Sequence, residues 1–178
     1  MLAIDGSPSG AGRTRRAVDA VTSAAAAAGA AVETVELAVP EGAERALDLL
    51  AGAQAVIVGS PVYRAAEAAP LKALLDRIPR QNDPERSSPV GAKAIAIVQT
   101  GASLHHFLAL DGLRAVFAGF FAAHVVPPGL YVPREGFDEA GGLAEPYAED
   151  ARRQGEALVG LAQAIAASPA LAAVRPQA

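Results

Sequence analysis

AVIVGSPVYRAAEAAPLKALLDRIP, residues 55–79, is the stretch that decides the fold. It opens with a short apolar run, 55–59, of the kind that forms a strand buried on both faces. We expect the strand to end at Ser60-Pro61, because proline has no backbone N–H to donate to a neighbouring strand. Apolar residues then recur with the spacing of one helix face: Leu71, Leu74, Leu75 and Ile78. The loop between strand and helix, 61–64, is where open α/β sheets bind ligands.

The composition narrows the classes of function. A chain of 178 residues suits one domain, which we expect to span residues 1–168, followed by a tail at 169–178. The formal net charge of −4 and the lack of a basic stripe argue against a nucleic-acid partner. The chain has no cysteine, which excludes disulfides, thiol catalysis and thiolate metal sites. Charged residues and prolines interrupt the apolar stretches, so we expect no membrane span and, without a signal peptide, a cytoplasmic location.

Strand and helix patterns alternate along the chain. The predicted strands are 2–5, 32–37, 55–60, 94–99 and 124–132, the last interrupted by Pro127-Pro128. The predicted helices are 13–28, 44–50, 68–78, 104–121 and 145–167, and a polar loop is expected at 80–91. This alternation predicts an α/β fold: a flavodoxin-like three-layer sandwich whose five-stranded parallel sheet has the order 2-1-3-4-5. In that order the loops after the first, third and fourth strands meet at one edge of the sheet.

The first of these loops, GSPSGAGRT at 6–14, has features of a phosphate site. Its small residues lead into a helix N-terminus, where free N–H groups and the helix dipole favour an anion. Ser7 and Thr14 add hydroxyl donors, and Arg13 can donate two hydrogen bonds to phosphate oxygens. A nucleotide-kinase P-loop is the rival interpretation, but the spacing is one residue too long and Arg13 replaces the expected lysine. A third interpretation is a strand–helix turn that binds no ligand.

The third loop, Thr100 to Ser103, is a glycine-containing turn before a predicted helix, and such a turn offers backbone donors. His105 and His106 follow it. Adjacent residues on a helix point about 100° apart, so we do not expect these histidines to hold a metal together. The same helix carries four of the five phenylalanines, more than one buried face needs, which suggests a homodimer or homotetramer: Phe107, Phe117, Phe120 and Phe121.

Three stretches together resemble the NAD(P)H-dependent FMN reductases. They are GSPSGAGRT, GSPVYRAAEAAPLKALLDRIP and IVQTGASLHHFLALDGLRAVF, which begin at residues 6, 59 and 97. Within that family they most resemble the reductases that supply reduced flavin to alkanesulfonate monooxygenases. The resemblance implies an FMN cofactor, hydride transfer from NADPH or NADH, and a flavin-dependent monooxygenase as partner. It implies no catalytic side chain, because the cofactor carries the chemistry.

The resemblance also implies which residues contact the cofactor. The first loop would hold the FMN phosphate, and the second and third loops would line the isoalloxazine ring. The residues are Ser7, Ser9, Arg13, Thr14, Pro61, Val62, Tyr63, Arg64, Thr100, Gly101, Ala102 and Ser103. Two related functions use the same loops and stay open: a quinone or azo-compound reductase that retains its FMN, and a flavodoxin-type electron carrier.

Overall fold

The computed structural model describes residues 1–80 and 88–176, and most of the polar loop expected at 80–91 lies outside them. The central sheet has the predicted order, which reads β2-β1-β3-β5-β6. Its strands are β1 (Leu2–Asp5), β2 (Glu33–Glu36), β3 (Ala55–Tyr63), β5 (Ala94–Gly101) and β6 (His124–Val125). The predicted fifth strand is divided, because β7 (Leu130–Pro133) also pairs with β5, farther along the same side. These pairs are all parallel.

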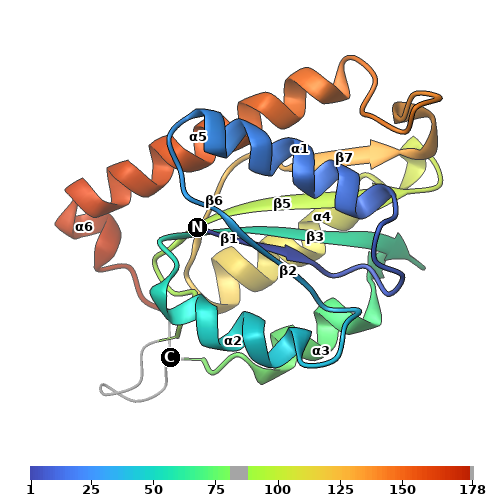
Figure 1. The fold of residues 1–178 in the computed structure, drawn as a ribbon. Helices are drawn as coiled ribbons and strands as arrows, with labels where there is room; N and C mark the ends of the chain where they lie inside the picture. Colours follow the sequence, from blue (N-terminus) through green and yellow to red (C-terminus); the bar gives the residue numbers. More distant parts are fainter. Residues whose placement is uncertain (81–87, 177–178) are drawn as a thin grey trace.

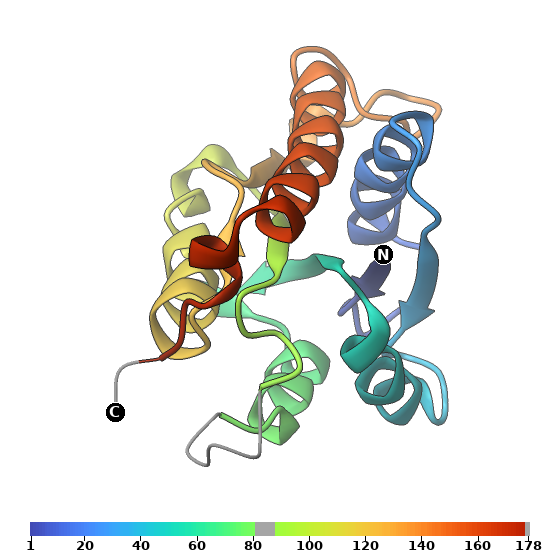
Figure 2. The ribbon, with the colours of Figure 1, turned by 90° about the vertical axis from the view of Figure 1, so that its left-hand side faces the viewer.

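Helices cover both faces of the sheet (Figures 1 and 2). One face packs against α1 (Arg13–Ala27) and α5 (Tyr147–Ala167), and the other against α2 (Gly42–Gly52), α3 (Ala69–Arg77) and α4 (Ala109–Arg114). Two buried apolar clusters fill the space between the layers, as the alternation of strand side chains requires. Within the described residues, no helix is long and apolar enough to cross a membrane.

Helix α1 confirms the sequence pattern in detail. Its buried side is an apolar stripe at helical spacing, Ala17, Val18, Val21 and Ala25, together with Thr14. Gly29 follows the helix with a φ of +94°, the left-handed conformation that ends helices and that glycine adopts without strain. Helix α5 packs closely on α1 at Gly155, where an added Cβ would lie 2.6 Å from the carbonyl oxygen of Val21. The small residues of α1 permit this approach.

The expected end of the third strand at Ser60-Pro61 is wrong. Strand β3 continues to Tyr63 and then forms a hairpin with β4 (Ala66–Glu67). The continuation is possible because β1 pairs with β3 only as far as Gly59, so that side of the strand needs no N–H from Pro61. On the other side, Pro61 stays in register with Thr100 of β5.

The long helix expected at 104–121 is also wrong. The segment divides into a 3₁₀ turn, η1 (Leu104–His106), then α4, and then the π-helical turn η2 (Ala115–Phe120). Phe117 and Phe121 are buried, whereas Phe107 and Phe120 are exposed. Apolar spacing marks which face is buried but does not distinguish α-helical from π-helical hydrogen bonding, so the sequence could not reveal this change.

Two smaller differences concern β5 and the C-terminal segment. Strand β5 extends to Gly101, so Thr100 and Gly101 belong to the strand and not to the following turn. After α5 comes a short helix, α6 (Pro169–Ala172), whose N-cap residue is Ser168; the Ser168 hydroxyl accepts a hydrogen bond from the N–H of Leu171. His124 on β6 lies 2.9 Å from the carbonyl oxygen of Leu171 and holds this segment against the sheet.

Candidate functional site

The first loop is shaped by the side chain of Asp5 at the end of β1. Its Oδ1 accepts a hydrogen bond of 2.9 Å from the N–H of Ser7, and the N–H of Gly6 donates to the carbonyl oxygen of Gly59 on β3. The hydroxyls of Ser7 and Ser9 lie 3.4 Å apart. The loop therefore turns sharply over the end of the sheet and delivers the chain to the start of α1.

The N-terminus of α1 faces this loop without a side-chain cap. Gly12 is the N-cap residue, and no side chain accepts hydrogen bonds from the first turn. The first N–H groups of a helix have no partner within the helix, so they are available to an anion. Arg13 begins the helix, is exposed, and has no side-chain partner among the described residues. This end of α1 can therefore bind a phosphate group.

A buried hydrogen bond joins the first turn of α1, after the first loop, to the end of β5, before the third loop. Thr14 Oγ1 lies 2.7 Å from Thr100 Oγ1, and both side chains are almost inaccessible to solvent. Gly59 allows α1 to pack closely on β3 beside this contact, since an added Cβ at that position would lie 2.2 Å from Cγ2 of Val18. The hydroxyl of Thr14 thus links α1 to β5, and this link fixes the positions of the first and third loops relative to one another.

The second loop is the β3–β4 hairpin. Arg64 and Ala65 form its turn with φ values of +54° and +64°, which non-glycine residues adopt only at some cost in energy. Tyr63 precedes the turn and is 56% exposed. Behind the hairpin, the buried hydroxyl of Ser60 accepts a hydrogen bond of 2.9 Å from the N–H of Ala68, the residue that precedes α3. The hairpin is therefore held at its base while Tyr63 projects at its outer end.

The third loop is held by a residue that the sequence did not point to. Tyr131 on β7 donates a hydrogen bond of 2.7 Å to the carbonyl oxygen of Ser103. Its hydroxyl lies where a side chain at Gly101 would be, because an added Cβ there would be 2.0 Å away. Burial, together with the nearby charge of Glu135, raises the pKa of Tyr131, so this phenol stays protonated and keeps donating. No pattern in a single sequence joins residues this far apart.

The three loops enclose one cavity of about 350 Å³ at the carboxyl edge of the sheet. Its lining contains Ser7, Ser9, Gly12, Arg13, Thr14, Pro61, Val62, Tyr63, Thr100, Gly101 and Ala102. Of the residues predicted from the sequence, only Arg64 and Ser103 are outside this lining, and Gly12 is an addition. The volume lies within the range of small-molecule and cofactor sites.

The electrostatics of the cavity combine a free cation with a buried acid. Arg13 supplies positive charge at the surface, whereas Asp5 is fully buried beneath the loop. Asp5 Oδ2 has no hydrogen-bond partner. Burial raises the pKa of Asp5, partly opposed by the hydrogen bond from the Ser7 N–H and by the charge of Arg15. The donors suit a phosphate, and the glycine-containing backbone of the third loop suits a flat ring, so the residues fit FMN, with Asp5 as an opposing charge.

A larger hollow of about 680 Å³ lies between α2 and the carboxyl end of β2, the outermost strand on one side of the sheet. Its lining is rich in carboxylates: Glu36, Glu41, Glu44 and Asp48. Arg45 is its one basic residue, and that side chain pairs with Glu33. Carboxylates repel phosphate groups, so this hollow does not suit a nucleotide, and the smaller cavity is the candidate site.

The histidines take no part in the lining of the cavity. His105 Nδ1 lies 3.2 Å from the hydroxyl of Ser103, on the exposed η1 turn, and His124 contacts the C-terminal segment. Among the residues that the structure describes, no three histidine, aspartate or glutamate side chains gather as metal ligands would.

The family model for NADPH-dependent FMN reductase matches residues 1–137, a span that includes all three loops. The chain belongs to this family. A relative from Pseudomonas putida, the NADH-dependent FMN reductase SfnF, is 40% identical over 94 residues, which cover 52% of this chain and 46% of that protein. An NAD(P)H-dependent FAD/FMN reductase from Geobacillus thermodenitrificans (strain NG80-2) is 26% identical over 106 residues, covering 60% and 54%. The chain thus spans about half the length of the curated relatives that it matches.

Solved structures agree with the fold. The apo form of the NADH:FMN oxidoreductase EMOB superposes with a TM-score of 0.75 at 23% identity, over 96% of this chain and 91% of that one. A flavodoxin, the WrbA-like protein from Agrobacterium tumefaciens, superposes with a TM-score of 0.67 at 21% identity, over 92% and 97%. At these identities the likeness supports the flavodoxin-like fold of the FMN reductase family and nothing finer.

Proposed function

We propose that this member of the FMN reductase family is an FMN-dependent NAD(P)H oxidoreductase and that the cavity between the three loops is its flavin site. The observation that supports the proposal most directly is the convergence of the three family motifs on one cavity at the uncapped N-terminus of α1. When bound there, FMN would supply the redox chemistry by accepting a hydride from a nicotinamide nucleotide. No side chain has to act as nucleophile.

The first loop and α1 would hold the phosphate of FMN. Free N–H groups of the first helical turn, the guanidinium of Arg13 and the hydroxyls of Ser7 and Ser9 are the donors at this end of the cavity. The hydrogen bond between Thr14 and Thr100 would hold this phosphate end at a constant distance from the ring end. The task of these residues is to bind and orient.

The second and third loops would hold the flavin ring. Pro61, Val62 and Tyr63 form one wall of the cavity, and Gly101 and Ala102 form another. Backbone groups of the third loop, held by Tyr131, would donate hydrogen bonds to the ring edge and stabilise negative charge there. Tyr63 lines the cavity and is 56% exposed, so part of its side chain is accessible to a second flat ring.

The resemblance to the FMN reductases also supports proposals about the partner, the location and the assembly of the protein. We propose that the reduced flavin passes to a flavin-dependent monooxygenase and that residues 1–168 form one cytoplasmic domain. We further propose that the protein assembles as a homodimer or homotetramer. Exposed large apolar side chains near the third loop support assembly: Leu104, Phe107, Leu108 and Phe120.

A visible spectrum of the purified protein with added FMN tests the proposal. We expect the flavin spectrum to shift on binding, and to bleach when NADPH or NADH is added anaerobically. Binding without bleaching by either nucleotide would instead support an electron carrier. Turnover with quinones or azo compounds, without release of FMN, would support a reductase that retains its flavin. A protein that leaves the FMN spectrum unchanged would contradict the assignment of the cavity.

A further inference from the structure

Nearly every basic side chain that the structure describes has a partner. Lysines and arginines form ion pairs on α1, α2, α3, α4 and α5, and others donate to backbone carbonyl oxygens, as Arg16 does to Gly141 and Lys93 does to Leu50. The exceptions within residues 1–80 and 88–176 are three exposed arginines without any side-chain hydrogen bond or ion pair: Arg13, Arg64 and Arg134.

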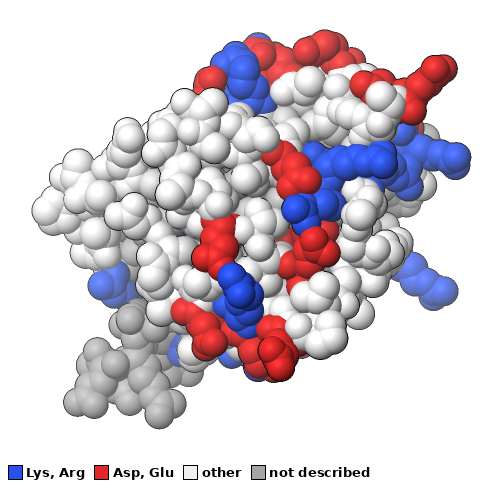
Figure 3. Space-filling model, in the orientation of Figure 1, with Lys and Arg blue, Asp and Glu red and all other residues white. Residues whose placement is uncertain are grey.

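These three arginines share one edge of the molecule. Arg13 begins α1 after the first loop, Arg64 directly follows β3, and Arg134 directly follows β7. Because β3 and β7 run parallel on either side of β5, all three positions lie at the carboxyl ends of the strands, around the cavity. In Figure 3, basic side chains gather on the right, where the strands of Figure 1 end.

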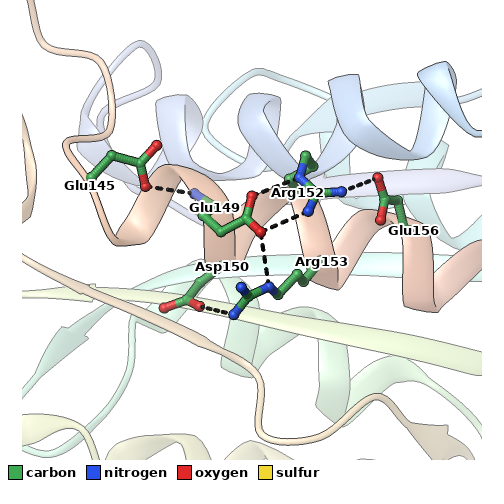
Figure 4. Close-up of polar contacts among 6 residues, drawn as sticks. All are labelled: Glu145, Glu149, Asp150, Arg152, Arg153 and Glu156. Carbon is green, nitrogen blue, oxygen red and sulfur yellow. Dashed lines mark hydrogen bonds and ion pairs between the residues drawn. The ribbon is translucent and has the colours of Figure 1, made fainter.

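The uncompensated charge here is unusual for this chain, which has a formal net charge of −4. Arginines on α5 show the alternative, since Arg152 and Arg153 are enclosed by carboxylates of their own helix (Figure 4). An arginine that binds no ligand can pair with a glutamate or aspartate three or four residues away on the same helix. Three that are left open around a cavity indicate an anionic ligand with several charges.

A single phosphate group does not explain why all three arginines lack partners. Arg13 lines the cavity, so the proposed FMN phosphate would be its ligand, whereas Arg64 and Arg134 lie outside that lining. Their strands are separated by two strand spacings, about 10 Å, with β5 between them. They therefore suit two anionic groups that are some distance apart and lie over the mouth of the cavity.

We infer that Arg64 and Arg134 bind the phosphate groups of the nicotinamide nucleotide and make the protein prefer NADPH to NADH. This inference rests on the proposed function. NADPH carries two separated anionic groups, the pyrophosphate and the 2′-phosphate, and NADH carries only the first. A nicotinamide ring at the open mouth beside Tyr63 would leave these groups to extend across the surface where the two arginines lie.

Isothermal titration of the FMN-saturated protein with adenosine 2′,5′-bisphosphate and with adenosine 5′-monophosphate tests the inference. We expect the bisphosphate to bind about tenfold or more tightly than the monophosphate, the difference that a charged hydrogen-bond partner makes. The double variant Arg64→Gln/Arg134→Gln should lose this difference, and the matched control Arg45→Gln should keep it. Arg45 is also exposed, but it lies on α2 and pairs with Glu33 on the outermost strand β2.

Kinetics provide a second measurement. The double variant should lose kcat/KM for NADPH through a raised KM, with kcat retained and FMN affinity unchanged. Equal binding of the two adenosine nucleotides by the wild-type protein, or a difference that survives in the double variant, would overturn the inference. Failure of the proposed function would look different: neither nucleotide would bleach FMN, while the titration would still report on the two arginines because it requires no reduction.

Discussion

Charged residues on α5 and at the carboxyl edge of the sheet are arranged in opposite ways. On α5, Arg152 bonds to both Glu149 and Glu156, and Arg153 bonds to Glu149 and Asp150 (Figure 4). The hydrogen bond from Arg152 is the main reason that the pKa of Glu149 falls from 4.5 to about 2. Every charge in this group has an opposite charge within three or four residues, the spacing at which helix side chains meet.

At the sheet edge, Arg13, Arg64 and Arg134 have no such partners, and Asp5 is buried with an oxygen that nothing satisfies. The difference separates two uses of charge. The charged groups on α5 are all paired within the folded chain, so we expect them to affect the stability of the helix and not ligand binding. The open arginines at the edge are completed only by an anionic ligand, which the charge of Asp5 would oppose. Substitutions in the two regions should therefore affect different measurements, and four predictions test this separation.

The largest effect is expected from Arg13→Gln. If this guanidinium binds the flavin phosphate, its loss should weaken FMN binding by about 1–3 kcal/mol, roughly tenfold to a hundredfold in Kd. Quenching of flavin fluorescence during titration measures the change. Stability should stay the same, because the exposed side chain of Arg13 makes no hydrogen bond or ion pair.

Arg152→Gln is the matched control for that titration. The same change on α5 removes a guanidinium that is fully paired with Glu149 and Glu156. FMN affinity in this variant should equal that of the wild-type protein. Equal weakening in both variants would mean that the contrast between open and paired arginines carries no information about the site.

The hydrogen bond between Thr14 and Thr100 should behave as part of the framework although it lies beside the cavity. Thr100→Val leaves the buried hydroxyl of Thr14 without a partner, so the free energy of unfolding should fall by about 1–2 kcal/mol. Replacing both residues by valine should cost less than the sum of the single changes. Urea unfolding of the four proteins measures this coupling, and strictly additive losses would contradict it.

Much of the fold could be predicted because local patterns determine it. The buried faces of α1 and α3 follow from 3.6-residue periodicity, and the sheet order follows from five alternations of strand and helix. The extension of β3 through Pro61 could not be predicted, because it depends on where the pairing of β1 with β3 ends. The π turn at Ala115–Phe120 depends on how backbone hydrogen bonds are shared, which side-chain spacing does not record.

The candidate site divides in the same way. Residues of the three loops were predictable because parallel strands end at one edge and the family motifs lie at those ends. Tyr131 was not, since its contact with Ser103 joins two separate strand ends. The open state of Arg64 and Arg134 was equally invisible, because an absent partner is a property of neighbours in space and not of neighbours in sequence.

Asp5→Asn removes the unpaired negative charge at the edge. Whereas Arg13→Gln should weaken FMN binding, this substitution should raise both stability and FMN affinity. Burial raises the pKa of Asp5 in the folded protein, so the fold favours the protonated form, and its stability falls as the pH rises through that pKa. The variant should be more stable than the wild-type protein at neutral pH, and this advantage should disappear below the ordinary pKa of aspartate. Unfolding midpoints measured between pH 3 and pH 8 provide the comparison.

At a pH high enough to ionise Asp5 in the folded protein, the same variant should bind FMN more tightly than the wild-type protein, roughly threefold to tenfold, because a negative charge beneath the phosphate loop is removed. Asparagine can still accept the hydrogen bond from the N–H of Ser7, so the turn of the loop should persist. Weaker binding of FMN by this variant would show that the carboxylate matters more for the shape of the loop than for its charge.

Glu149→Gln should give the smallest effect and only on stability. In the folded protein the arginines hold the pKa of Glu149 near 2, whereas in the unfolded chain it returns to about 4.5. The ion pairs therefore stabilise the fold above the ordinary glutamate pKa, and this contribution is lost as the pH falls toward 2. The wild-type protein should thus lose slightly more stability than the variant on acidification, and high salt should reduce the difference because both partners are exposed. FMN affinity should not change, since the charges on α5 are complete without a ligand; a change in affinity would show that the two regions are coupled.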